Sequence, residues 1–407
     1  MSKFKWTSRY TLIAAAIGGL LLLMLGTGVY NSRPIPTSTP TAAPTSTPRP
    51  SPTPLPLPTF TPTMAPLTKI TVLGGGPFIG AAKTYLAQKY NQDVVSISMG
   101  SGQMAAVDLN AKDANGNKLY PNGVDCIWPA TKGFANLFQE YHPNTKVRKS
   151  EAEFYTDYVF FVSRQYSDEY IKAGYATKDA NGKITFDLKA FIQAELDEKT
   201  YADMGIKNVP GMVHFELSDA VNSGGGLAFM ELAASQLVNG NTNGSRIINQ
   251  VDLQQQPDIL TNLQKIYLLS GDMESDSLKQ WDKFYLTGGT SLLGSYDSGY
   301  FLLLGSLGPN NQQRAKDVVG MYPKFTIKVP HQLVSISPAC DTLIDEFAND
   351  PKLQQIGLDQ GLHTRAGAFG TVNSNADWYS KTPTDTIPEP NAATIRAIYE
   401  ALLQLTK

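Results

Sequence analysis

Short polar turns rich in glycine, serine and threonine recur along this sequence, and they carry residue types suited to binding a ligand. Two of them are Gly100-Ser101-Gly102 and the turn that ends at Thr131, each placed where an apolar run gives way to a helical pattern. Backbone N–H groups at the start of a helix are free to donate, and the helix dipole favours an anion or a ligand oxygen there. Glycine lets a ligand approach the backbone closely, and the hydroxyl groups add donors.

Further turns of this kind lie in the second half of the chain. Ser218–Gly226 combines four polar side chains with three consecutive glycines ahead of a helical pattern, and Ser295–Tyr300 precedes an apolar run. An ordinary N-cap or turn glycine is the alternative for any single turn. Several such turns in one chain favour a shared binding site. The candidate ligand-binding residues are Gly76, Ser101, Gly102, Thr131, Asn222, Ser223, Gly224 and Tyr296.

The elements that must position these turns alternate between strand and helix. Apolar runs predict strands at 70–73, 94–99 and 124–128, and periodic patterns predict helices at 78–90 and 132–141. This alternation indicates an α/β fold with a mainly parallel sheet covered by helices. In such sheets a ligand binds at the carboxyl ends of the strands, which is where the glycine-bearing turns lie.

The remainder of the chain continues the same pattern. We expect a buried strand at 158–163, a hairpin around Asp179–Gly182, strands at 318–323 and 331–336, and a helix at 340–349. Residues 67–407 are too many for one small hydrophobic core, and their number suits two lobes of ordinary domain size.

Composition excludes several classes of function. A net charge of −2 without a basic run argues against nucleic acid as a partner, and four scattered histidines with two cysteines make no metal-ligand spacing. The glycine turns lack the carboxylate that a dinucleotide fingerprint requires, and no Gly-x-Ser-x-Gly or His-Glu-x-x-His motif occurs. We therefore expect no enzyme activity, no cofactor and no metal. Cys126 and Cys340 form a disulfide or remain buried thiols, and sequence alone leaves both open.

The N-terminal segment predicts a membrane attachment. Leu12–Tyr30 is uncharged and apolar and follows three basic residues, so residues 1–33 are expected to form a cytoplasmic stub and a transmembrane helix. A cleaved signal peptide is the alternative. Residues 34–66 alternate proline with threonine and serine, which predicts an extended spacer. The folded domain is then extracellular or periplasmic.

The order of these features resembles that of bacterial extracellular solute-binding proteins with the type II periplasmic fold, the class that includes phosphate- and molybdate-type binders. The segments that carry the resemblance are Gly100–Gly102, Val124–Thr131, Asp219–Met230, Gly294–Tyr300 and the stretch from Tyr322 to Val334.

The resemblance implies a monomer with two lobes joined by two crossing strands. Lobe I would comprise residues 67–157 and 335–407, and lobe II residues 158–334. It also implies that the lobes close on a small ligand, such as an oxyanion, and deliver it to the permease of an ABC-type importer. A surface sensor or scaffold that signals to a partner protein is the alternative function.

Overall fold

The computed structural model describes residues 66–406 apart from 241–245, 272, 275–276, 287, 307–315, 370–375, 377, 380–384 and 388. The predicted transmembrane helix and residues 34–65 of the predicted spacer lie outside this set. Within it, no helix is both long and apolar enough to cross a membrane.

The N-terminal part of the domain alternates strand and helix, as the apolar pattern predicts. Strand β1 pairs in parallel with both β2 and β3, and the connecting turns lead into helices. The elements are β1 (Thr68–Gly74), α1 (Gly76–Tyr90), β2 (Gln92–Ile97), α2 (Ser101–Ala105), β3 (Cys126–Trp128) and α3 (Lys132–Tyr141).

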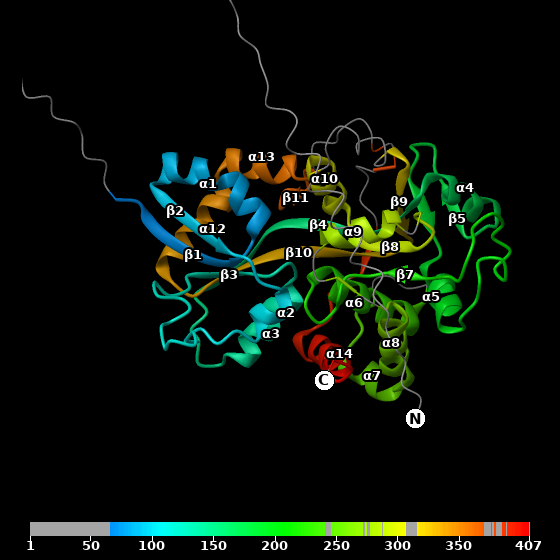
Figure 1. The fold of residues 1–407 in the computed structure, drawn as a ribbon, viewed down its shortest axis with the longest axis horizontal. Coiled ribbons are helices and arrows are strands. Elements are labelled where there is room, and N and C mark those ends of the chain that lie inside the picture. Colours follow the sequence, from blue (N-terminus) through cyan, green and yellow to red (C-terminus); the bar gives the residue numbers. More distant parts are fainter. Residues whose placement is uncertain are drawn as a thin grey trace, which may run out of the picture. The chain divides into compact units, whose positions relative to one another are not determined.

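Two long strands run through both lobes. β4 (Lys149–Ser163) pairs antiparallel with β10 (Thr326–Ser335) as far as Asp157, and from Tyr158 onward it pairs with β8 and β9 instead. Figure 1 shows these two strands crossing the domain side by side. Because β10 is also antiparallel to β3, the sheet is mixed, so the prediction of a mainly parallel sheet was wrong.

Lobe II is built on the second half of β4. Its strands β5 and β6 form the predicted hairpin around Asp179–Gly182, and β6 continues the sheet beside β9. The strands are β5 (Ala176–Lys178), β6 (Ile184–Phe186), β7 (Phe215–Glu216), β8 (Leu292–Tyr296) and β9 (Val318–Pro323). The helices are α4 (Arg164–Lys172), α5 (Leu188–Leu196), α6 (Gly224–Asn239), α7 (Gln250–Gln255), α8 (Asp258–Leu269), α9 (Ser277–Leu286) and α10 (Asp297–Ser306).

The C-terminal segment first returns to the core of lobe I and then joins the core of lobe II, where it ends on a helix that contacts both lobes. α14 packs against α8, α7 and α6 of lobe II and against α3 of lobe I, and Figure 1 shows it between them. The elements are α12 (Pro338–Asn349), α13 (Pro351–Asp359), β11 (His363–Thr364), β12 (Thr386–Ile387) and α14 (Ala392–Leu403).

The structure joins Cys126 and Cys340 in a disulfide, with their Cα atoms 5.5 Å apart and a sequence separation of 214. Both cysteines lie in the core of lobe I, where β3 meets α12. The bond therefore closes a loop that contains all of lobe II. Of the two states left open by the sequence, the disulfide is the one observed.

Replacing both cysteines by alanine should lower the free energy of unfolding by about 2–4 kcal/mol, because the bond restricts the unfolded chain. Chemical denaturation with and without a reducing agent measures the change. The reductant should weaken the parent chain and leave Cys126→Ala/Cys340→Ala unaffected. Equal midpoints for the oxidised parent and this double variant would contradict a stabilising role.

The register of β4 against β10 shifts at Glu153, because His331 pairs with Phe154 and the next residue, Gln332, pairs with Ala152. Glu153 is fully buried, and neither of its carboxylate oxygens has a hydrogen-bond partner among the described residues. Burial raises the pKa of Glu153 to about 8, while the charge of Arg365 opposes the shift. The buried carboxyl group is therefore protonated at neutral pH.

This burial makes the stability contributed by Glu153 depend on pH. The unfolded carboxyl group titrates near 4.5 and the folded one near 8, so stability is present below pH 4.5 and is lost as pH rises to 8. Glu153→Gln lacks this titration, so it should gain stability over the parent by up to about 1.4 kcal/mol per pH unit across that window. Urea denaturation of both proteins at pH 5 and pH 8 measures this, and a constant difference between them would contradict it.

Candidate functional site

A cavity of about 350 Å³ lies between the two lobes. Lobe I contributes the turn that starts α1, the start of α2 and the end of β3, while lobe II contributes the junction of β8 and α10. The lining residues are Gly74–Phe78, Ser98, Met99, Ser101, Met104, Trp128–Ala130, Ser295, Tyr296, Ser298, Gly299, His331, Gln360 and Leu362.

Glycine shapes the wall at the start of α1. Gly75 occupies the N-cap position with φ of 65°, a left-handed conformation that favours glycine, and no side chain caps this helix. The first amides of a helix have no partner within the helix, so those of α1 that carry a hydrogen are available to a ligand in the cavity. Gly76, one of the predicted residues, lies here.

Three of the predicted residues line the cavity, namely Gly76, Ser101 and Tyr296. The amide of Ser101 donates to the backbone oxygen of Asn222 at 2.7 Å, so it is engaged in a contact between the lobes. Its Oγ accepts a long hydrogen bond of 3.4 Å from the amide of Ala130.

The other predicted residues lie at or beside this contact between the lobes and outside the cavity lining. A Cβ atom at Gly102 would come within 1.8 Å of the Val221 oxygen, and one at Gly224 within 3.0 Å of the Thr131 methyl group. The hydroxyl of Thr131 caps α3 by accepting from the Phe134 amide at 3.2 Å. Ser223 is the N-cap residue of α6, without a capping bond from its side chain.

The cavity lining contains no aspartate, glutamate, lysine or arginine among the described residues. Burial raises the pKa of Tyr296 well above its ordinary value and lowers that of His331 to about 4, so both are neutral at pH 7. Tyr296 Oη and His331 Nε2 have no hydrogen-bond partner in the described part of the chain. Buried polar atoms are normally paired, so these two are suited to meet polar groups of a ligand.

Several lining residues were not predicted from sequence. Trp128 ends an apolar strand and is predicted as a core residue; it lies in the core of lobe I beside Phe78, and it also lines the cavity. His331 and Gln360 come from distant parts of the chain, and no local pattern marks them. Ser298 could have been predicted from sequence, because it belongs to the polar turn that contains Tyr296.

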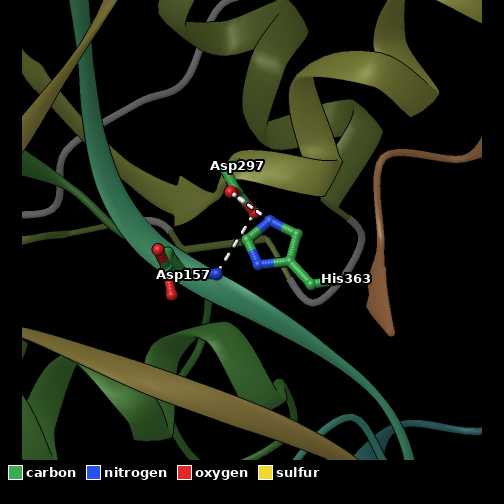
Figure 2. A group of neighbouring side chains, drawn as sticks. All are labelled: Asp157, Asp297 and His363. Carbon is green, nitrogen blue, oxygen red and sulfur yellow. Dashed lines mark hydrogen bonds and ion pairs between the residues drawn. The ribbon is translucent and has the colours of Figure 1, made fainter. Parts of the chain in front are cut away.

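A second polar group lies where β4 changes partners. Asp157 on β4, Asp297 at the start of α10 and His363 on β11 are all buried, and their potential ligand atoms lie within 4.8 Å of one another. Figure 2 shows the His363 ring directed at Asp297, with Asp157 beside them on β4. Burial lowers the pKa of His363, but the charge of Asp297, its hydrogen bond to His363 and the charge of Asp157 together outweigh burial and raise the pKa above its ordinary value.

Two lobes on shared long strands, with a cavity between them, are the arrangement found in a known group of solved structures. The domain has the fold of periplasmic binding proteins. It is similar to AfuA from Actinobacillus pleuropneumoniae, described with bound fructose 6-phosphate, at 14% identity and a TM-score of 0.52, covering 84% of this chain and 98% of that one.

Two further structures with this periplasmic binding fold are similar. Apo FutA2 from Synechocystis matches at 10% identity and a TM-score of 0.50, covering 84% of this chain and 98% of that one. Iron-bound HitA from Pseudomonas aeruginosa matches at 11% identity and a TM-score of 0.50, covering 83% of this chain and 97% of that one. No protein-family model and no curated protein matches the sequence. None of these three structures is described with inorganic phosphate or molybdate, so the subtype implied by the sequence resemblance is not confirmed.

Gly102 provides a direct test of the lobe contact in this binding-protein fold. Gly102→Ala would place a methyl group against the Val221 oxygen and near the Tyr399 hydroxyl, so it should force α2 away from lobe II. We expect a loss of about 1–3 kcal/mol in unfolding free energy, as for other overpacked sites. Hydrogen exchange at the Ser101 amide should accelerate, because its bond to Asn222 is lost.

Gly80→Ala is the matched control, since a Cβ atom at this position in α1 meets nothing within 4 Å. It should stabilise the helix by about 0.5–1 kcal/mol and leave exchange at Ser101 unchanged. If Gly102→Ala behaved like this control, the close approach of the lobes would be refuted.

Proposed function

We propose that this chain is the solute-binding component of an ABC-type importer, held at the outer face of the membrane by its N-terminal segment. The observation that carries the proposal is the cavity between two lobes, lined from both sides by uncharged donors and acceptors. The similarity of the domain to periplasmic binding proteins supports the fold that this proposal requires. The apolar run Leu12–Tyr30 and the proline-rich spacer support the attachment.

The ligand in this proposal is a small polar organic molecule with at most one oxyanion group. Phe78 and Trp128 offer apolar ring surface, and the serines, Tyr296 and His331 offer hydrogen bonds. One anionic group is accommodated at the start of α1, where helix amides and the dipole favour negative charge. A second charge would find no opposite charge in the described lining, and burying it would be costly.

Ligand capture is then a shift between open and closed arrangements of the lobes. The ligand stabilises the closed arrangement only by as much as it binds that arrangement more tightly than the open one. Contacts from both lobes supply this difference, since Ser101 and Tyr296 line the same cavity from opposite sides.

A thermal-shift screen of the purified chain tests the ligand class, because a ligand that binds only the folded state raises the melting temperature. The screen contains sugars, sugar phosphates and inorganic oxyanions. We expect some sugars or sugar phosphates to raise the melting temperature, and inorganic phosphate or molybdate alone to leave it unchanged. Tyr296→Phe and His331→Gln should each weaken the best hit by about 1–3 kcal/mol in calorimetry.

Tyr170→Phe is the control for these variants, since it removes a buried hydroxyl from lobe II at a position that does not line the cavity. Unchanged affinity in both cavity variants, or a response confined to inorganic oxyanions, would contradict the proposed ligand site. Uptake of the labelled ligand by cells with and without the chain tests the importer role separately.

A further inference from the structure

The cluster of Asp157, Asp297 and His363 lies outside the lining of the cavity and has a geometry of its own. The three residues are 5%, 1% and 2% exposed, and they come from β4, α10 and β11. Each element therefore brings one side chain to the same buried region, and Figure 2 shows these three side chains near one another.

Asp297 is held so that one carboxylate oxygen remains directed at His363. Its Oδ1 accepts hydrogen bonds from Thr156 Oγ1 at 2.5 Å, from the Ser298 amide at 2.8 Å and from the Asp157 amide at 3.2 Å. Its Oδ2 lies 2.9 Å from His363 Nε2. Outer hydrogen bonds of this kind orient the carboxylate ligands of metal ions.

Asp157 supplies an independent observation. It is more than nine-tenths buried, yet no hydrogen bond from the described residues reaches its carboxylate. Burial is the main cause that raises its pKa, followed by the charge of Asp297. Lys183 and Lys328 act on it only through their charges, while their ammonium groups lie over the rings of Tyr322 and Tyr155. A buried carboxylate beside a second one requires a proton or a cation.

We propose that Asp157, Asp297 and His363 form a binding site for one divalent transition-metal ion of the zinc type. One imidazole nitrogen with two carboxylate oxygens suits zinc or manganese better than magnesium or calcium, which prefer oxygen ligands alone. Neighbouring ligand atoms on a zinc ion lie about 3–3.5 Å apart, as follows from bonds of about 2.0–2.2 Å. The 2.9 Å separation of Asp297 Oδ2 and His363 Nε2 is close to this range, and a carboxylate oxygen of Asp157 lies within 4.8 Å of both.

The position of the site gives the ion a role in the fold. Asp157 is the last residue of β4 that pairs with β10, and Tyr158 begins the pairing with β8. His363 pairs with Tyr155 through β11, and Asp297 starts α10. An ion bound to all three would tie together the elements that meet where the lobes join.

Calorimetric titration of the full chain, stripped with EDTA and kept in mild detergent, tests the site with zinc chloride as the probe. We expect one equivalent bound with micromolar or tighter affinity, a higher melting temperature on binding, and weaker binding of magnesium and calcium. Asp157→Asn and His363→Gln should each lower zinc affinity at least 10-fold.

Asp157→Asn preserves the shape of a side chain that makes no hydrogen bonds, so it should remain folded, and its melting curve in EDTA checks this. Asp345→Asn, at an exposed carboxylate, is the control and should bind zinc like the parent. Absence of zinc binding by the parent, or one equivalent retained in folded Asp157→Asn, would overturn the proposal. Both results are independent of whether the cavity binds an organic ligand.

Discussion

The antiparallel pairing of β4 with β10 is the constraint on which the rest of the domain depends. Each lobe completes its sheet on one half of β4, so the lobes are joined by continuous strand and not by a free linker. The change of partners at Asp157 and Tyr158 brings elements from both lobes to one point. His331 on β10 lines the cavity, and the Asp157 cluster lies at the change of partners, so both polar groups owe their position to this pair of strands.

The uncharged lining of the cavity follows from how the lobes meet. Ser101 and Gly102 of lobe I already contact Asn222 and Val221 of lobe II, so the lobes meet directly beside the cavity. A charged side chain there would lose hydration without gaining a partner, at a cost of several kcal/mol. Neutral hydroxyl, phenol and imidazole groups avoid this cost, and they select a ligand by the geometry of its hydrogen bonds.

Local elements were predictable from sequence, whereas the assembly of distant segments was not. Helix α3 has the predicted bounds, and the glycine turns after β1 and before α2 line the cavity. The sheet was predicted as mainly parallel because β10, which reverses the direction, enters from a remote part of the chain. The disulfide partner of Cys126 and the positions of Asp157 and His331 at their sites are set by tertiary contacts in the same way. The place of Trp128 in the cavity lining was missed for another reason, since an aromatic residue at a strand end looks the same in sequence whether or not the core that it joins borders a cavity.

The two polar groups of the domain are linked through the start of α10. Ser298 lines the cavity, and it also contacts Thr156 Oγ1 through its hydroxyl at 3.0 Å and donates its amide to Asp297. Tyr296, two residues earlier, reaches the same cavity from the end of β8. A change of charge or of bound ion beside Asp297 therefore acts on the backbone that presents Ser298 and Tyr296 to a ligand. Because coupling free energies are reciprocal, a ligand that fixes this turn would in turn alter the affinity of the buried cluster for a cation.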